Sequence, residues 1–400
     1  MWADRPAAQQ RRELVDTLRR VLPVGGFAGD PIARLSATSG IATITTACAE
    51  VQLPARGFDL IEAALEAWEG FGDARLFGYL GYELGAELED VPHVEAEPGE
   101  VPDLYLELYQ RWEAEQDRSL TVAAPNSYTI SNTPTDEGFC ATVARTVERI
   151  YKGELFQVNL CRRLETALSS DEILPLYNRL CEITPATYAA FIRISDSAAV
   201  LSASPELFLS VRNGCVRSCP IKGTRPRGAT PEDDRAFAAA LLASEKDRAE
   251  LSMIVDVVRN DLGRVCQVGS VRVTRHTELM TLPTVHHTFS EVTGRLRPEY
   301  GPADLLRAAF PPASISGAPK IRAMEVAALE ESYRRGPCMG SIGWIGMNGD
   351  MELSVAIRTA VADRGRVYYL AGCGITAESM PEEELAESEA KAAAFLRALG

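Results

Sequence analysis

Histidine and tryptophan are scarce in this 400-residue chain, with four of each, and no apolar run is long enough to span a bilayer. Positive charge is also in short supply, because the net charge is −15 at pH 7 and the pI is about 4.9. Such a chain repels nucleic acid and anionic membranes, which argues against both as partners. Residues 1–20 are charged and lack the apolar region of a signal peptide.

Cysteine occurs nine times but never as a CxxC pair. An odd number of cysteines spread over a long chain suits neither a disulfide framework nor a zinc site. We therefore expect reduced thiols, most of them small core residues. Together with the missing signal region, this predicts a cytoplasmic protein.

Hydrophobic residues make up 46% of the chain, which is enough for a large buried core. Strand-like runs gather at 188–219 and 341–375, and helical stretches such as 231–265 and 381–400 are inserted between them. This order predicts an α+β fold with large, mainly antiparallel sheets, packed as a sandwich and flanked by helices. A polar, proline-containing stretch that ends near residue 135 separates a predicted N-terminal lobe, residues 1–135, from a domain of residues 136–400. The lobe is expected to bind an effector or to be structural.

Two local signals predict element ends. The turn "RNGC", with Asn213 and Gly214 at its centre, is typical of a tight β-hairpin. Thr230 is expected to cap a long helical region that reaches Val265, with Pro231 in its first turn.

Acidic residues cluster on two predicted helices, in "SEKDRAE" and in "PEEELAESEAK". Asp247 and Glu250 are spaced i, i+3, and so are Glu384 and Glu387, so each pair lies on one side of its helix. Two such faces brought together would form an oxygen-rich site suited to Mg²⁺. Acid-rich helices are more often solvated surfaces, and both interpretations stay open at this point.

Lys222 stands in "PIKGTRPRG", between a Pro-Ile pair and a Gly-Thr turn, with Arg225 and Arg227 close behind. It is either an ordinary lysine in a surface turn or a nucleophile. "TVHHTFS" places His286 beside His287, where a strand edge is a simpler explanation than catalysis.

Two further stretches have open interpretations. "VVRNDLGRV" crowds Arg259, Asn260, Asp261 and Arg264 at a helix end, either as a buried polar network or as a capping cluster. "LAGCGIT", with Gly372 and Gly374, lets backbone N–H groups approach an anion, or it forms a plain tight turn.

Taken in order, these stretches resemble the chorismate-utilising enzymes, a family that includes the anthranilate, aminodeoxychorismate, isochorismate and salicylate synthases. The resemblance covers residues 139–400 and rests on "KGELFQVNL", "SASPELFL", "PIKGTRPRG", "EKDRAELSMIVDVVRNDLGRV", "ASISGAPK", "GSIGWIG", "AIRTA", "AGCGIT" and "EEELAESEAKA". N-terminal to it, only "FGYLGYE" matches well. The resemblance implies the family's anthranilate-synthase-like fold, a chorismate-binding catalytic domain at 136–400, and Mg²⁺ as cofactor.

Two positions point to the aminodeoxychorismate synthase branch of the family. Members that activate water carry a lysine base where this chain has Gln157, and a glutamine cannot act as a base. Anthranilate synthases typically read "PIAGT" where this chain reads "PIKGT", and in the aminating branch the lysine is the nucleophile. The resemblance therefore implies that Lys222 attacks C2 of chorismate while the C4 hydroxyl leaves with a proton from Glu206. Ammonia then displaces the lysine, which gives 4-amino-4-deoxychorismate for p-aminobenzoate and folate synthesis.

The same resemblance assigns the remaining site residues. His287 is the third catalytic residue, although His286 is one step away and the choice between them stays open. Where family members have glutamate and often tyrosine, this chain has Asp247 and Trp344. The predicted magnesium ligands are Glu250, Glu387, Asp247 and Glu384, and the predicted substrate-binding residues are Gln157, Thr224, Trp344, Arg358, Gly372, Gly374 and Lys391.

The resemblance also bears on partners and control. The chain has no "GxCxG" nucleophile turn, so we expect ammonia to come from a separate glutamine amidotransferase subunit or from solution. The tryptophan-binding "LLES" segment of anthranilate synthases is replaced by "IARLSATSG", so tryptophan control is not expected.

Two alternatives remain. One is anthranilate synthase component I, which makes anthranilate and pyruvate from the same substrate. The other is a non-catalytic chorismate-binding protein, which would have no need of the acidic faces.

Overall fold

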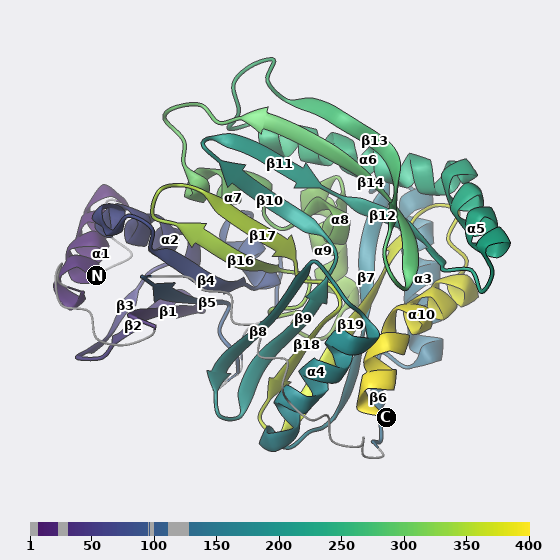
Figure 1. Ribbon diagram of the computed structural model, residues 1–400, viewed down its shortest axis with the longest axis horizontal. Coiled ribbons are helices and arrows are strands. Elements are labelled where there is room, and N and C mark those ends of the chain that lie inside the picture. The colour runs from purple at the N-terminus through teal and green to yellow at the C-terminus, as the bar shows by residue number, and fades with distance from the viewer. Residues whose placement is uncertain (1–6, 23–30, 95, 97–99, 111–127) are drawn as a thin grey trace.

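The computed structural model describes residues 7–22, 31–94, 96, 100–110 and 128–400, and these form two large antiparallel β-sheets with helices around them (Figure 1). The larger sheet has 12 strands: β1 (Ala33–Thr38), β2 (Ile41–Thr46), β3 (Glu50–Pro54), β4 (Arg75–Leu80), β5 (Leu104–Tyr109), β10 (Leu207–Arg212), β11 (Cys215–Cys219), β12 (Ile221–Pro226), β13 (Arg272–Thr281), β14 (Val285–Arg295), β16 (Ser341–Gly346) and β17 (Met351–Val355). The smaller sheet has seven: β6 (Ser131–Thr133), β7 (Gln157–Ala167), β8 (Tyr188–Ser195), β9 (Ala198–Ser204), β15 (Gly317–Ala318), β18 (Thr359–Asp363) and β19 (Arg366–Ile375). The predicted α+β class is confirmed.

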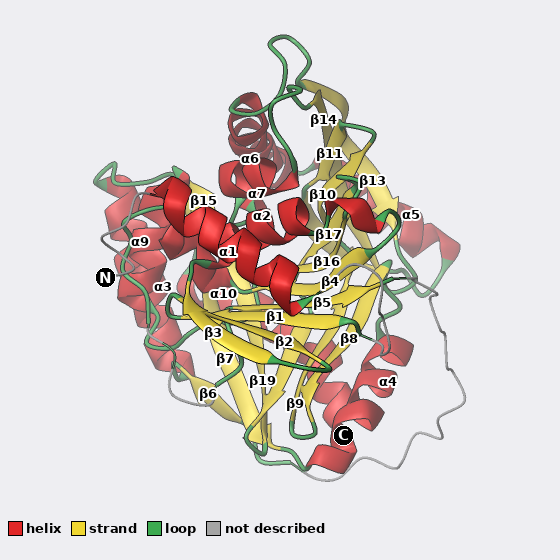
Figure 2. Ribbon diagram, turned by 90° about the vertical axis from the view of Figure 1, so that its left-hand side faces the viewer, coloured by secondary structure: helices red, strands yellow, loops and turns green. Residues whose placement is uncertain are grey.

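The helices cover the outer faces and the ends of the sheets. They are α1 (Ala7–Val21), α2 (Gly57–Ala67), α3 (Asp136–Tyr151), α4 (Ile173–Ile183), α5 (Pro231–Ala243), α6 (Glu245–Gly263), α7 (Pro302–Ala309), α8 (Ala313–Ser316), α9 (Lys320–Glu330) and α10 (Pro381–Leu399). In Figure 2, α1 and α2 lie together over the N-terminal strands. α6 packs against β12 and β14 of the larger sheet, and α10 packs against β19 of the smaller one.

The main core fills the space between the two sheets and extends under the helices that pack on the larger sheet, such as α2, α6 and α7. It contains side chains from both sheets, such as Leu353 from β17 and Val200 from β9. All seven residues of β9 are buried, because this strand is covered on both faces. A second core joins the smaller sheet to α4 and α10, where Tyr369 and Phe395 stack with ring centroids 4.8 Å apart.

The N-terminal strands do not form a sheet of their own. β4 pairs with β16 in the middle of the larger sheet, and β5, β1, β2 and β3 follow on from it. The sheet thus crosses the proposed boundary at residue 135, and that division stays a prediction. Parts of the predicted lobe, residues 1–6, 23–30, 95, 97–99 and 111–127, lie outside the described residues.

Local signals in the sequence match the structure at several element ends. Asn213 and Gly214 both have positive φ and join β10 to β11, as the hairpin signal predicted. Thr230 caps α5 by accepting a hydrogen bond from the Asp233 amide. The predicted long helical region nevertheless divides in two, because Ser244 leaves the helical conformation and caps α6 through the Asp247 amide.

Across the described ranges, no helix is both long and apolar enough to pass through a membrane.

Candidate active site

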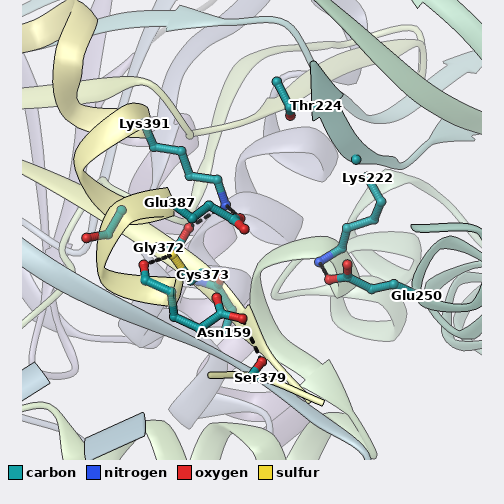
Figure 3. Close-up of polar contacts among 12 residues, drawn as sticks. Asn159, Lys222, Thr224, Glu250, Gly372, Cys373, Ser379, Glu387 and Lys391 are labelled. Carbon is teal, nitrogen blue, oxygen red and sulfur yellow. Dashed lines mark hydrogen bonds and ion pairs between the residues drawn. The ribbon is translucent and has the colours of Figure 1, made fainter. Parts of the chain in front are cut away.

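A cavity of about 640 Å³ lies between β12, at one edge of the larger sheet, and β19, in the interior of the smaller sheet. β12 and α6 form one side of it, and β19 and α10 form the other. In Figure 3, Lys222 and Glu250 face Glu387 and Lys391 across this space. Most of the charged residues singled out in the sequence therefore meet in one place.

Lys222 reaches the cavity because the strand that carries it is irregular. Lys222 pairs with Thr288 of β14, and the register then shifts before Thr224 pairs with His287. Gly223, between them, has φ +65°, and a Cβ there would lie 2.8 Å from Leu241. Only glycine adopts this conformation freely in so little space, so Gly223 sets the bulge that positions Lys222.

The Lys222 ammonium is largely buried and paired with a carboxylate. Its Nζ lies 2.6 Å from Glu250 Oε1, and the two side chains are 11% and 14% exposed. Gln157, which is buried and does not itself line the cavity, also donates a hydrogen bond to this oxygen. A Cβ atom on Gly374 would lie 2.5 Å from Glu250 Oε1 and 3.3 Å from Lys222 Nζ, so any larger residue there would displace both groups.

Glu206, which lies between β9 and β10, is almost fully buried in the cavity wall. Burial raises the pKa of Glu206 to about 7, and Ser314, the Ile221 amide and Lys222 offset this only in part. A carboxyl group with such a pKa can hold a proton near neutral pH and give it up again.

His287 lines the cavity, and its imidazole ring is uncharged near neutral pH. Burial lowers the pKa of His287 to about 4, and its Nδ1 lies 3.0 Å from the Gly223 carbonyl oxygen. A carbonyl can only accept, so we assign the ring hydrogen to Nδ1, which leaves Nε2 as an acceptor. No described residue bonds to that buried Nε2. His286 instead turns away to Asp234, with its Nε2 2.9 Å from Asp234 Oδ1, and it does not line the cavity.

Two carboxylates of α10 line the cavity opposite Lys222. Glu384 is 3% exposed, and burial raises its pKa. One oxygen of Glu384 accepts from the Ser379 hydroxyl at 2.6 Å, whereas the other has no partner among the described residues. Glu384, Glu387 and Cys373 each offer a ligand atom, and these atoms lie within 4.8 Å of one another.

Lys391 holds this side of the cavity in place. Its ammonium lies 2.7 Å from Glu387 Oε1 and donates to the Gly372 carbonyl at 2.8 Å. Burial lowers the pKa of Lys391, but Cys373 and Glu387 outweigh it, so the pKa ends above its usual value. A permanent cation therefore sits beside Glu387 and Gly372.

The other predicted residues differ in position. Arg358 and Thr224 line the cavity, and Arg358 has φ +51°, which is unusual for a residue other than glycine and is often found at functional sites. Asp247 also lines it, but its carboxylate is paired with Arg225 at 3.2 Å. Trp344 is not brought to the cavity: it lies in β16, where Arg75 and Arg212 pack on its ring.

Sequence reasoning did not single out several residues that line the cavity, including Asn159, Ser314, Lys246 and Arg397. Three of them lie in stretches that carried the family resemblance: "FQVNL", "ASIS" and "SEKD". Their place within a recognised stretch was the one signal that could have found them. Arg397 belongs to a helix end with no motif.

An α+β fold whose cavity gathers carboxylates and cations is suited to a small anionic substrate, and comparison with known proteins identifies the class. A family model described as chorismate binding enzyme matches residues 4–397, so the chain belongs to this family and is a chorismate-utilising enzyme.

Relatives within the family have two different names. The chain is 39% identical to aminodeoxychorismate synthase component 1 of Salmonella typhimurium, over 78% of this chain and 73% of that protein. It is 37% identical to anthranilate synthase component 1 of Acetivibrio thermocellus, over 68% of this chain and 55% of that protein. A solved structure of anthranilate synthase component I from Streptococcus pneumoniae has a TM-score of 0.76 and 26% identity, and covers 92% of this chain and 91% of its own.

Proposed function

We propose that this chain aminates chorismate to 4-amino-4-deoxychorismate through a covalent adduct on Lys222. The observation that carries the proposal is Lys222 itself, a largely buried amine at the wall of the cavity. The similarity to aminodeoxychorismate synthase component 1 supports it. Since the proposed site residues all lie beyond residue 135, we also propose residues 136–400 as the catalytic part.

The proposed chemistry uses the side chains as follows. The Lys222 amine forms a bond to C2 of chorismate, the ring double bond shifts, and the C4 hydroxyl leaves as water with the proton of Glu206. Ammonia then forms a bond to C4, the double bond shifts back, and the bond from C2 to Lys222 breaks. The surplus proton on the new amine returns to the Glu206 carboxylate, which closes the cycle. An ammonium cannot attack, so Lys222 must first lose a proton and its ion pair with Glu250.

We propose Glu250, Glu384 and Glu387 as the ligands of a Mg²⁺ ion. The free oxygen of Glu384 is buried without a partner, and the carboxylates around it offer the oxygen atoms that Mg²⁺ prefers. The Cys373 thiol is a poor ligand for this ion and donates to the Glu384 carbonyl oxygen. When bound, Mg²⁺ would neutralise a carboxylate of the substrate and withdraw electrons from its ring. Asp247, paired with Arg225, is proposed only as a neighbour of this set.

The other predicted residues that line the cavity are proposed to bind the substrate: Thr224, Arg358, Gly372, Gly374 and Lys391. Arg358 lines the cavity and offers a planar guanidinium for a carboxylate. His287 is proposed as the third catalytic residue, and its Nε2 lone pair can accept a hydrogen bond from a substrate hydroxyl. The relative in Salmonella typhimurium is named component 1, which implies a second component, and we propose that an amidotransferase subunit supplies ammonia to this chain.

Product analysis tests the proposal. The protein would be incubated with chorismate, Mg²⁺ and ammonium, and the products identified by mass spectrometry with and without an added aminodeoxychorismate lyase. We expect a product that the lyase converts to p-aminobenzoate. Anthranilate with release of pyruvate would instead assign the chain to the activity named for its relative in Acetivibrio thermocellus. Metal-independent binding of chorismate without turnover would identify a binding protein.

Lys246 gives a prediction about substrate capture. It is exposed, it lines the cavity, and it forms no ion pair within the described part of the chain. A cation there should attract a dicarboxylate to a protein of net charge −15. We expect Lys246→Gln to raise the KM for chorismate about two- to fivefold at low salt, with a smaller effect on kcat.

The control for Lys246 is Lys152→Gln, which removes an exposed lysine outside the cavity. Initial rates measured over a range of salt concentrations should show the KM difference shrinking as salt screens the charge. An effect of equal size at high salt would contradict the electrostatic explanation.

A further inference from the structure

A second, much smaller cavity lies directly behind Glu206. Its volume is about 10 Å³, close to the lower limit of about 10–15 Å³ for holding one water molecule. Of the described residues that line the two cavities, only Glu206 and Ser314 line both. These two side chains are therefore the wall between the active site and the smaller cavity.

The far wall of the smaller cavity carries a buried ion pair. Asp261 of α6 is 5% exposed, and its Oδ2 accepts a hydrogen bond from Lys320 Nζ at 2.6 Å. Lys320 also donates to the Ala309 carbonyl at 2.6 Å, and Arg264 donates to the other Asp261 oxygen at 3.2 Å. Of the four residues singled out in "VVRNDLGRV", only Asp261 is buried in this network, whereas Arg259, Asn260 and Arg264 are exposed. Burial raises the pKa of Asp261, and Lys320 and Arg264 offset this only in part, but both of its oxygens accept hydrogen bonds from these cationic donors, which favours the carboxylate form.

The polar atoms around the smaller cavity lack enough partners. Ser314 Oγ is buried without a well-formed hydrogen bond to any described residue, although it lies close enough to the Glu206 carboxyl to lower its pKa. Glu206 Oε1 accepts a long contact of 3.4 Å from the Ile221 amide. The rest of the lining is largely apolar, with side chains such as Phe208 and Leu262. Polar groups in such surroundings are costly unless they are bonded, and a water needs two to four polar partners.

We propose that the smaller cavity holds one water, and that this water and the Asp261–Lys320 pair orient the proton of Glu206. Asp261 can only accept, so the water gives one hydrogen to Asp261 and the other to one oxygen of Glu206. The Ser314 hydroxyl donates to the water. The second Glu206 oxygen is then left to carry the proton and present it to the larger cavity. Asp261, Lys320 and Ser314 are thus positioning residues, and this inference rests on the proposed role of Glu206.

A double-mutant cycle tests this coupling. Asp261→Asn gives the water a donor in place of an acceptor, which reverses the water and turns the Glu206 proton inward. We expect kcat for ammonia-dependent chorismate consumption to fall at least about tenfold, with KM nearly unchanged. In a Glu206→Gln background the same substitution should have almost no further effect, because no proton is left to orient. Effects that multiply in the double variant would overturn the proposal.

Two further variants guard against misfolding. Ser314→Ala leaves the ion pair intact and should show the same dependence on Glu206. Glu331→Gln breaks a comparably buried pair with Arg335, 2.7 Å apart, that lines neither cavity, and its effect should not depend on Glu206. A crystal structure of the protein should show a water within hydrogen-bond distance of Ser314 and Asp261, and a dry cavity would overturn the proposal.

The cycle separates failure of this inference from failure of the proposed function. It is read as chorismate consumption, so it remains valid if the product proves to be anthranilate. If Glu206→Gln alone leaves kcat unchanged, the proposed role of Glu206 and the inference built on it both fail.

Discussion

Lys222→Ala should abolish the formation of aminodeoxychorismate, with a fall in rate of at least about a thousandfold, or about 4 kcal/mol in the barrier. The reason is that alanine has no nucleophile for the C2 position, while Glu206 and the carboxylates opposite remain in place. Lys222→Arg is the matched variant, because an arginine keeps a positive charge beside Glu250 but does not give up its proton. Both variants should be inactive, and mass spectrometry of the intact protein should find a substrate adduct only on the unmodified chain.

The opposite outcome would be equally informative. If Lys222→Ala keeps the ammonia-dependent consumption of chorismate and releases pyruvate, then Lys222 is not a nucleophile. The chain would then share the activity named for its anthranilate synthase relatives. Lys152→Ala, at the exposed end of α3, controls for nonspecific loss of activity on removing a lysine.

Glu206→Gln should lower kcat by about a hundredfold to ten-thousandfold, the range expected when a general acid is removed. The amide has nearly the same shape but cannot protonate the leaving hydroxyl. Because burial raises the pKa of Glu206 to about 7, the group carries its proton below that pH and loses it above. We therefore expect kcat of the unmodified enzyme to fall as the pH rises through about 7, and this decline should be missing from the Gln variant.

Stability gives an independent check on the state of Glu206. Its pKa is higher in the folded protein than its ordinary value of 4.5, so the folded state binds more protons between 4.5 and about 7. The contribution of Glu206 to the free energy of unfolding is thus fully present below 4.5 and is lost as the pH rises through about 7. Glu206→Gln should flatten this part of the stability profile in denaturant titrations. An unchanged profile would mean that Glu206 is ionised throughout.

The sequence predicted the site better than it predicted the arrangement of the sheets. Lys222 and Glu387 were found because short motifs surround them, and the structure brings both to one cavity. Trp344 does not line the cavity, because a motif indicates a strand but not which way each side chain points, and neighbours on a strand alternate between faces. Its predicted role in substrate binding stays a prediction. The break at Ser244 was missed since helical residues continue on both sides of it.

Long-range pairing was beyond the reach of sequence patterns. β4 and β16 are far apart in the chain, and their hydrophobic residues show that each is a strand but not that they are neighbours. The Asp261–Lys320 pair is a second example. The sequence near a helix end is the same whether or not a distant lysine pairs with its aspartate, so the pattern does not predict this ion pair. Both outcomes were decided by packing.

The pairing of β4 with β16 affects how far the chain can be dissected. If residues 1–135 were removed, β16 would keep its pairing with β17 but lose its pairing with β4, and it would become an open edge of the sheet. Its sequence, "SIGWIG", has no charge to discourage other chains from adding to it. A shortened protein would therefore tend to self-associate through this strand even with every proposed catalytic residue present. By pairing with β16, the N-terminal strands prevent strands of other molecules from adding to the sheet at this position.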